Sequence, residues 1–252
     1  MTSADMSVIA ILCILAIVLS LTVFMVWASA SIRSGVYVRA FCREKTDRKV
    51  VYLTFDDGPH PPETERVLDV LRERGARATF FLIGSKVSGN EAVLRRMLEE
   101  GHTLGLHTYS HAGTFPLLSF DKMLADVNEG KRVVESVAGK KISLFRPPFG
   151  VTNPTIAKVV RTLGLQTVGW DVRSFDTMFC KSSEHDWYVP VVERIMKQVR
   201  PGSVILLHDR LDGASSLLAL LLDSLAASGY DFTRALPNTL ISSSDSSETN
   251  LS

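Results

Sequence analysis

The chain has 252 residues, of which 46% are hydrophobic, so it can bury one large core of the size that a single α/β barrel has. Its 28 basic and 27 acidic residues nearly balance, and no basic tract suggests a nucleic-acid partner. The three cysteines form no paired framework; a disulfide between Cys42 and Cys180 is not excluded, but spacing alone does not establish one. We assign the cysteines no role and predict no protein partner.

The N-terminal segment is apolar and uncharged from Val8 to Ala28, interrupted only by Ser20 and Thr22. A run of about 20 such residues is long enough to span a bilayer as a helix. Residues 28–30 also resemble a signal-peptidase site, but the run is long for a signal peptide and no Lys or Arg precedes it. We therefore predict an uncleaved membrane anchor over residues 1–30, followed by a juxtamembrane link over residues 31–49.

Strands and helices alternate after this link. Residues 50–53 form the first predicted strand, and residues 64–74 form a helix that Gly75 ends. Further strands are predicted at 78–83, 102–106, 143–145, 166–170, 203–207 and 231–233, and further helices at 90–100, 121–137, 154–163, 190–199 and 217–228. About seven strands and six helices in alternation predict a parallel α/β sheet or barrel. The Ser-rich segment 238–252 is predicted to be disordered.

Two short motifs together indicate a metal site. His107 and His111 are four residues apart, which places them on one face of a helical turn, and Asp56 and Asp57 precede a Gly-Pro turn. Two imidazoles and one carboxylate make three ligands, which for zinc leaves one coordination position open for water. Adjacent carboxylates point in different directions, so the second can act as a base. Taken singly, the histidine pair is more often exposed or packed in a core, and Asp-Asp-Gly-Pro is more often a turn.

The polar motifs share a position relative to the predicted strands. Each follows a strand, at its C-terminal end or in the next loop: residues 56–57, 107–111, 146–150, 176 and 208–209. In barrel enzymes this face carries the active site. Residues that served only core packing would be scattered over both ends, so we expect these five loops to converge on one site.

These motifs resemble, in order and spacing, those of the polysaccharide deacetylase family, also called the NodB-homology domain or carbohydrate esterase family 4. They are TFDDGP at 54–59, HTYSH at 107–111, RPPFG at 146–150, the stretch 170–176 and LLHD at 206–209. The resemblance covers residues 50–237. It implies a distorted (β/α) barrel and a hydrolase that uses one divalent metal ion to remove acetyl groups, mostly N-acetyl groups of amino sugars.

The resemblance also assigns the central residues. It makes Asp57, His107 and His111 the metal ligands, Asp56 the general base and His208 the general acid. Zinc is the expected ion, although two histidines and one aspartate also admit cobalt or nickel. In this scheme the metal polarises the amide carbonyl, the base takes a proton from water, and the acid protonates the departing amine.

Further residues take supporting roles in the same scheme. Arg146 is expected to orient and restrain the base, and Asp176 to tune the general acid. Leu206 is expected to line the pocket for the acetyl methyl group, and Phe149 in the RPPFG motif to contact substrate. His102, at the start of a predicted strand, is interpreted as structural. Loop residues near the proposed site are interpreted as solvated rather than as substrate contacts: residues 60, 185 and 186.

Two positions depart from the family pattern. The family usually has Trp after the aspartate of the fourth motif, as one wall of the acetyl pocket, whereas this chain has Thr177. Arg173 stands where an acidic residue is frequent. Both changes leave the metal ligands and the proton carriers intact but put substrate specificity in question. Trp187, in the predicted loop 178–189, is our hypothesis for the missing wall.

Three function classes follow. The first is a metal-dependent deacetylase of an N-acetylated glycan: peptidoglycan, a chitin-like polymer or another surface polysaccharide. The second is a glycan-binding relative without turnover. The third is a membrane-tethered deacylase of a small or lipid-linked N-acyl sugar, which the short link favours.

Charges around the apolar segment bear on its orientation. Arg33, Arg39, Arg43 and Lys45 follow the segment, while only Asp5 and the terminal amine precede it. The positive-inside rule alone would place the domain in the cytoplasm. A surface polymer instead requires the domain outside, so we expect a single-pass protein of the cell membrane with an extracytoplasmic catalytic domain.

Overall fold

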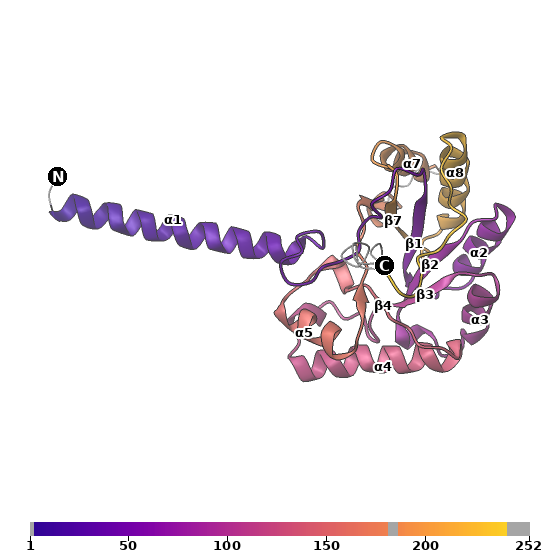
Figure 1. The fold of residues 1–252 in the computed structure, drawn as a ribbon, viewed down its shortest axis with the longest axis horizontal. Helices are drawn as coiled ribbons and strands as arrows, with labels where there is room; N and C mark the ends of the chain where they lie inside the picture. Colours follow the sequence, from indigo (N-terminus) through magenta and orange to yellow (C-terminus); the bar gives the residue numbers. More distant parts are fainter. Residues whose placement is uncertain (1–2, 181–185, 241–252) are drawn as a thin grey trace, which may run out of the picture.

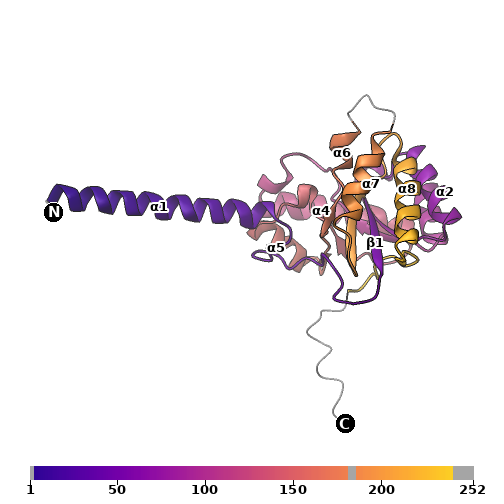
Figure 2. The same cartoon turned by 90° about the horizontal axis from the view of Figure 1, so that it is seen from above.

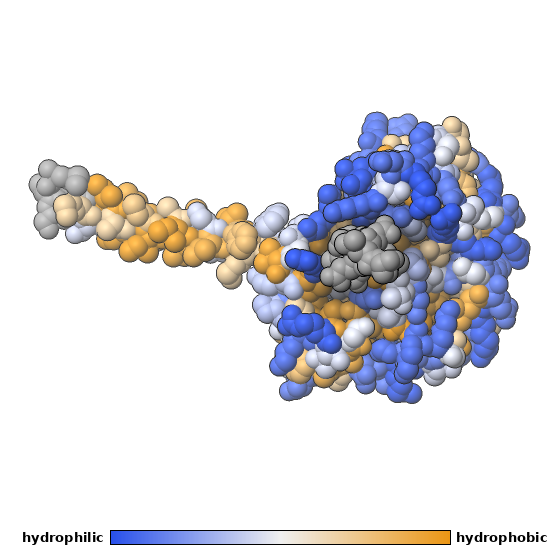
Figure 3. Space-filling model, in the orientation of Figure 1, coloured by the Kyte–Doolittle hydropathy of each residue, from blue (hydrophilic) through white to orange (hydrophobic). Residues whose placement is uncertain are grey.

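The computed structural model describes residues 3–180 and 186–240. Helix α1 (Ser3–Ala30) extends away from a rounded domain that contains the rest of these residues (Figure 1). Its surface is apolar, whereas hydrophilic residues cover much of the domain face in the same view (Figure 3). The part Ile9–Ala30 is long and apolar enough to cross a membrane, and a signal sequence shares these properties. The predicted apolar N-terminal helix is thus confirmed.

The domain is built on one parallel sheet whose strand order is β5-β4-β3-β2-β1-β7-β6. The strands are β1 (Val51–Gly58), β2 (Ala78–Leu82), β3 (Thr103–Leu106), β4 (Leu144–Phe145), β5 (Gln166–Thr167), β6 (Val172–Arg173) and β7 (Ser203–His208). The chain between β5 and β6 runs from one edge of the sheet to the other. Along it, Gly169 N donates to Phe41 O of the link, and Asp171 N donates to Val204 O of β7. This arrangement confirms the distorted barrel of seven parallel strands.

Helices cover the outer face of the sheet (Figure 2). They are α2 (Glu63–Glu73), α3 (Glu91–Glu99), α4 (Phe120–Ala138), α5 (Pro154–Thr162), α6 (Asp176–Phe179), α7 (Tyr188–Met196) and α8 (Ala214–Ala227), with the short 3-10 turns η1 (Gly84–Lys86), η2 (Phe115–Leu117) and η3 (Pro148–Gly150). Each of the longer domain helices buries a stripe of apolar residues against the sheet, as α2 does with Val67, Leu68 and Leu71.

Side chains along the central strands alternate between two cores. Leu53 and Phe55 of β1 lie in the large core under the helices, whereas Tyr52 and Val204 lie in a smaller core on the inner face of the sheet. Every second side chain of a strand points to the same face, so Thr54 lies on the inner face of β1, next after Tyr52. We call such a line of inward-facing side chains an inner row. The inner faces of β1 and β7 therefore carry polar residues toward the C-terminal end of the barrel.

One predicted strand differs from the structure, and two short elements were not predicted. The predicted strand 231–233 is a single bridge between Val50 and Asp231, and the Asp231 carboxylate instead accepts from the backbone N and the hydroxyl of Thr233 at 2.8 and 2.7 Å. Such local bonds favour a turn over a strand. Strand β6 and helix α6 were not predicted, because the sequence around them shows neither an apolar run nor a helical period.

The end of α1 and the following link are packed on the domain. Ala28 and Ile32 are buried, with 0% and 4% of their surface exposed. Ser29 O accepts a hydrogen bond from Thr152 N at 2.9 Å. Residues 38–45 of the link border a cavity of about 650 Å³ that contains none of the predicted site residues. The link is therefore part of the folded domain rather than a free tether.

The C-terminal segment that was predicted to be disordered is bonded where it begins. Asn238 Nδ2 donates to Lys141 O at 3.1 Å, and Leu240 N donates to the side-chain oxygen of Gln166 at 2.6 Å. Residues 241–252 lie outside the described part of the chain.

Candidate active site

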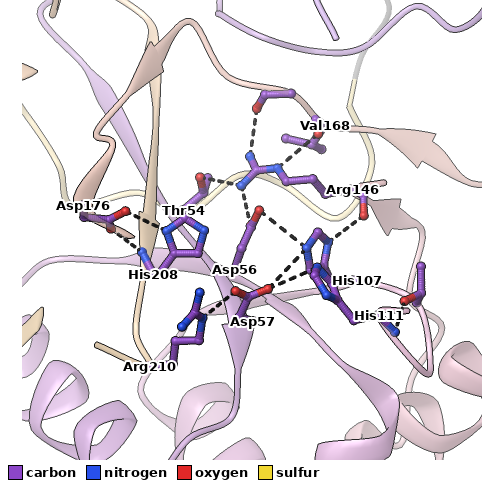
Figure 4. A network of polar contacts seen from close by, with 12 residues as sticks. Thr54, Asp56, Asp57, His107, His111, Arg146, Val168, Asp176, His208 and Arg210 are labelled. Atoms are coloured by element: carbon purple, nitrogen blue, oxygen red, sulfur yellow. Dashed lines mark hydrogen bonds and ion pairs between the residues drawn. The ribbon is translucent and has the colours of Figure 1, made fainter. Parts of the chain in front are cut away.

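Strand β1 delivers two carboxylates to the C-terminal end of the barrel. The pairing of β1 with β2 shifts between Asp56 and Gly58, and Asp57 has a left-handed backbone with φ of 74°. A bulge of this kind re-aims one side chain relative to the regular alternation. Both adjacent carboxylates therefore face the same polar cluster, although a regular strand would point them to opposite faces (Figure 4).

The two histidines reach this cluster from an irregular loop after β3, and the predicted helical turn is wrong. Thr108 and His111 have left-handed backbones with φ of 68° and 49°, which a helix does not contain. The Thr108 hydroxyl accepts from His111 N at 2.9 Å and holds the loop closed. The rings of His107 and His111 are thereby brought to a centroid distance of 4.7 Å.

Asp57, His107 and His111 form a group that can hold a metal ion. Each offers a ligand atom, and these atoms lie within 4.8 Å of one another. Asp57 Oδ1 is 3.6 Å from His107 Nε2 and 3.4 Å from His111 Nε2. His107 Nδ1 is 2.7 Å from Arg146 O, so it carries the proton and leaves Nε2 free as a ligand. Two imidazoles and one carboxylate fit a divalent ion such as zinc.

Arg146 is fully buried beside the candidate base. Its Nη1 donates to Asp56 Oδ1 at 2.7 Å and to the Thr54 hydroxyl at 2.9 Å. Its Nε and Nη2 donate to the backbone oxygens of Val168 and Gly169 at 3.2 and 2.8 Å (Figure 4). A guanidinium with so many fixed partners holds the carboxylate of Asp56 in one orientation.

The candidate acid lies opposite the candidate base. His208 in β7 pairs in register with Asp56 in β1, and partners across parallel strands face the same side of the sheet. Asp176 accepts from His208 N at 2.9 Å and contacts His208 Nδ1 at 2.8 Å. Burial lowers the pKa of His208, but the hydrogen bond and the charge of Asp176 outweigh burial and raise this pKa above its ordinary value. Nε2 is left to deliver a proton.

Comparison with known proteins gives the same family. Residues 43–168 match the family model described as polysaccharide deacetylase. Peptidoglycan-N-acetylglucosamine deacetylase from Bacillus cereus is 36% identical over 193 residues, which cover 74% of this chain and 86% of that relative. The chain belongs to the polysaccharide deacetylase family. Chitooligosaccharide deacetylase from Azorhizobium caulinodans is 34% identical over 164 residues, which cover 63% of this chain and 73% of the relative.

The solved structure of the peptidoglycan deacetylase PdaC from Bacillus subtilis has the same fold. It aligns with a TM-score of 0.66 and 32% identity, over 74% of this chain and 87% of PdaC. This polysaccharide deacetylase is thus a hydrolase of amide bonds with the barrel of its family, as the sequence motifs implied.

Arg210 is a site residue that the sequence did not reveal. Its Nε donates to Asp57 Oδ2 at 2.7 Å, and Lys86 Nζ donates to Asp57 O at 2.8 Å. Burial raises the pKa of Asp57, but the charges of His107 and His208 together with the Arg210 hydrogen bond lower it to about 2. No spacing rule connects residue 210 to the acidic pair, and only its position directly after the LLHD motif could have drawn attention to it.

Asp209 braces the turn that follows the carboxylate pair. It is fully buried, and its Oδ2 accepts from the Thr64 hydroxyl at 2.7 Å. A Cβ atom on Gly58 would lie 2.5 Å from the same oxygen, so a larger residue at this position would have to displace the Asp209 carboxylate. Burial raises the pKa of Asp209 to about 7. This residue stabilises the end of β1 on which the deacetylase places its carboxylates.

The predicted substrate contacts differ in exposure. Phe149 is 52% exposed, and its ring lies 5.2 Å from the ring of His111. Leu206 is buried on the inner row between β1 and β6. Trp187 is 7% exposed and packs in the large core, and a Cβ on Gly213 would lie 3.3 Å from the indole Nε1. Little of the Trp187 surface is therefore available to a ligand. Its role as a pocket wall stays a prediction.

Neither His60 nor His102, the other two described histidines, belongs to the group of candidate metal ligands. His102 is buried and its Nδ1 accepts from Ala78 N at 3.2 Å, which fits a structural role; burial lowers its pKa to about 4. His60 is exposed in the loop after β1. Asp186 accepts from the Tyr188 hydroxyl at 3.2 Å, and residue 185 lies outside the described part of the chain.

Proposed function

We propose that this polysaccharide deacetylase removes N-acetyl groups from amino sugars of an extracytoplasmic glycan, with peptidoglycan as the first candidate substrate. One observation carries the proposal: the metal-ligand group, the Asp56–Arg146 pair and the His208–Asp176 pair meet at one end of the barrel (Figure 4). The names of relatives that act on peptidoglycan and on chitooligosaccharides support this substrate class.

Asp57, His107 and His111 would hold the metal ion, with zinc as the expected species and cobalt or nickel compatible with the same donors. When bound, the ion supplies Lewis-acid activation of the amide carbonyl and of water. Two further contacts hold the ligand side chains in place. Arg146 O fixes the ring of His107 at 2.7 Å, and Arg210 fixes the outer oxygen of Asp57 at 2.7 Å.

Asp56 would remove the proton from the attacking water. Its Oδ2 lies 3.9 Å from His107 Nε2, so the base adjoins the ligand group, while its Oδ1 is held by Arg146 at 2.7 Å. With one oxygen fixed, the other is free to accept a proton from a water beside the ligands. Thr54 shares the same guanidinium nitrogen and restricts its movement further.

His208 would protonate the departing amine. Asp176 holds Nδ1 and raises the pKa of the ring, so the ring stays protonated to higher pH than an ordinary histidine. The proton leaves from Nε2, and cleavage of the amide carbon–nitrogen bond then gives acetate and a free amino sugar. Because Asp56 and His208 occupy paired positions on adjacent strands, the proton acceptor and the proton donor lie side by side.

The packing of the C-terminal end of α1 on the domain supports an uncleaved anchor. Cleavage after Ala30 would remove the buried side chain of Ala28 and the carbonyl of Ser29 that accepts from Thr152 N at 2.9 Å. With the anchor uncleaved, the domain would remain at the membrane, outside the cytoplasm, where peptidoglycan lies. The packing of the end of α1 on the domain also favours a second candidate substrate, a lipid-linked N-acyl sugar held close to the bilayer.

The proposal is tested with the full chain in lipid nanodiscs. We expect mass spectrometry to show loss of acetyl groups from N-acetylglucosamine oligomers or from peptidoglycan fragments, and we expect Asp56→Asn to abolish this loss. Arg95→Gln is a matched control, because Arg95 is an exposed residue of α3 away from the ligand group. A folded, metal-loaded protein that binds glycan but removes no acetyl group would favour the binding relative instead.

A further inference from the structure

An exposed arginine lies on the inner row of the sheet beside the candidate acetyl-binding residue. Arg173 of β6 pairs with Leu206 of β7, and Leu206 pairs with Thr54 of β1. Partners across parallel strands face the same side, so these three side chains form one row. The next row toward the strand ends contains Asp56 and His208. Arg173 is thus one row from the candidate base and acid, and it is exposed to solvent.

Aromatic rings hold the guanidinium of Arg173 in place. The guanidinium carbon lies 4.6 Å from the centre of the Phe175 ring and 6.0 Å from that of Trp170. The guanidinium carbon of Arg146 lies 5.5 Å from the centre of the same Trp170 ring, so one indole adjoins both arginines. Arg194 of α7 adds a second cation at 4.5 Å from the Phe175 ring. Stacking of this kind orders a guanidinium while its N–H groups remain available to a ligand.

The positive charge of Arg173 is not balanced by the two carboxylates nearest to it in sequence, Asp171 and Asp176. In the described part of the chain, neither Arg173 nor Arg194 forms an ion pair, and Arg194 Nε is buried without a hydrogen-bond partner. Asp171 contacts Arg200 Nε at 3.3 Å and accepts from a backbone N of β7 at 2.9 Å. Asp176 is bonded to the candidate acid. Two cations at one ring repel each other, and a bound anion would relieve that repulsion.

We propose that Arg173, held by Trp170 and Phe175, binds an acidic group, a carboxylate or a phosphate ester, on the sugar next to the one that loses its acetyl group. The inference rests on the proposed function and narrows its substrate class to acidic glycans. A guanidinium binds such groups through two parallel hydrogen bonds, and an aromatic face packs against a sugar ring. Arg194 adds a second positive charge to the same subsite. The arginine thus accounts for one of the departures from the family pattern.

The test compares three oligomers of equal length with the full chain in nanodiscs. One is a neutral N-acetylglucosamine oligomer, one carries a carboxylate on the neighbouring sugar, and one carries a phosphate ester there. We expect kcat/KM for at least one acidic oligomer to exceed the neutral value by about tenfold, as one exposed bidentate ion pair allows. Arg173→Gln should remove this preference by raising KM for the acidic oligomer, and Arg173→Lys should restore part of it. The two acidic arms identify which acid is recognised.

Arg95→Gln removes a charge that is also exposed and should leave all three values unchanged. Equal kcat/KM for the three oligomers in the unmodified protein, or an equal loss on all of them in Arg173→Gln, would overturn the subsite. If no oligomer loses acetate, calorimetric binding of the same oligomers separates the two claims. Tighter binding of an acidic oligomer that Arg173→Gln abolishes supports the subsite while the proposed function fails.

Discussion

Arg210 Nε lies 2.7 Å from Asp57 Oδ2, while Asp57 Oδ1 faces the two histidines at 3.6 and 3.4 Å. One oxygen of the carboxylate is thus tied to an arginine, and the other is directed at the ligand group. We expect Arg210→Ala to weaken metal binding by about tenfold to a hundredfold, the effect typical of a lost partner of a metal ligand. Titration calorimetry with zinc measures this directly. Arg132→Ala, an exposed arginine of α4, is the control, and equal affinity in the two variants would contradict the role.

The buried pair of Arg146 and Asp56 should control stability as well as catalysis. Arg146→Ala leaves the carboxylate buried without its cation, so we expect a loss of about 3–5 kcal/mol in the free energy of unfolding. Asp56→Asn in the same variant should recover part of that loss, because no uncompensated charge remains. Urea denaturation of the unmodified protein, Arg146→Ala, Asp56→Asn and the double variant gives the comparison. Additive losses in the double variant would show that the two side chains are not coupled.

The His208–Asp176 contact should set the alkaline limit of activity. Burial lowers the pKa of His208, and Asp176 more than reverses this, so the acid stays protonated to higher pH than an ordinary histidine. Asp176→Asn removes the raising charge. We therefore expect the alkaline limb of the kcat profile to move to lower pH, while the acidic limb, which the base controls, stays in place. A profile with an unmoved alkaline limb would assign that limb to another group.

Buried His102 should make the fold sensitive to acid. Burial lowers its pKa from 6.5 to about 4, so between these values the unfolded chain binds a proton that the folded chain does not. Stability is therefore complete above pH 6.5 and falls as the pH drops toward 4, by about 3 kcal/mol from this group. His102→Asn keeps an acceptor for Ala78 N and cannot titrate. Denaturation at several pH values should show a weaker acid dependence in this variant, and an identical dependence would refute the assignment.

The sequence was sufficient where a pattern repeats or a motif is long. The amphipathic helices were predicted within a few residues of their bounds, as with residues 64–74 against Glu63–Glu73. The five motifs also predicted which residues meet at the end of the barrel. These features depend on periodicity and chain order, which a sequence contains.

Features that depend on tertiary contact or unusual backbone geometry were missed. The loop at 107–111 brings its histidines together through positive φ at Thr108 and His111, whereas spacing alone favoured a helical turn. Strand β6 is held by its pairing with β7, and the sequence around it contains no apolar run that would indicate a strand. Arg210 contacts Asp57 only because folding brings the residues after β7 beside the end of β1. The two positions are 153 residues apart in the sequence.

Acetate release from N-acetylated glycan, before and after removal of the metal, tests the central claim most directly. The full chain in nanodiscs would be treated with a chelator, assayed, reloaded with zinc and assayed again, with His107→Ala in parallel. The account predicts that release stops with the chelator, returns with zinc and never appears in the variant. Undiminished release from metal-free protein, or normal release by His107→Ala, would contradict a deacetylase that depends on the Asp57, His107 and His111 group.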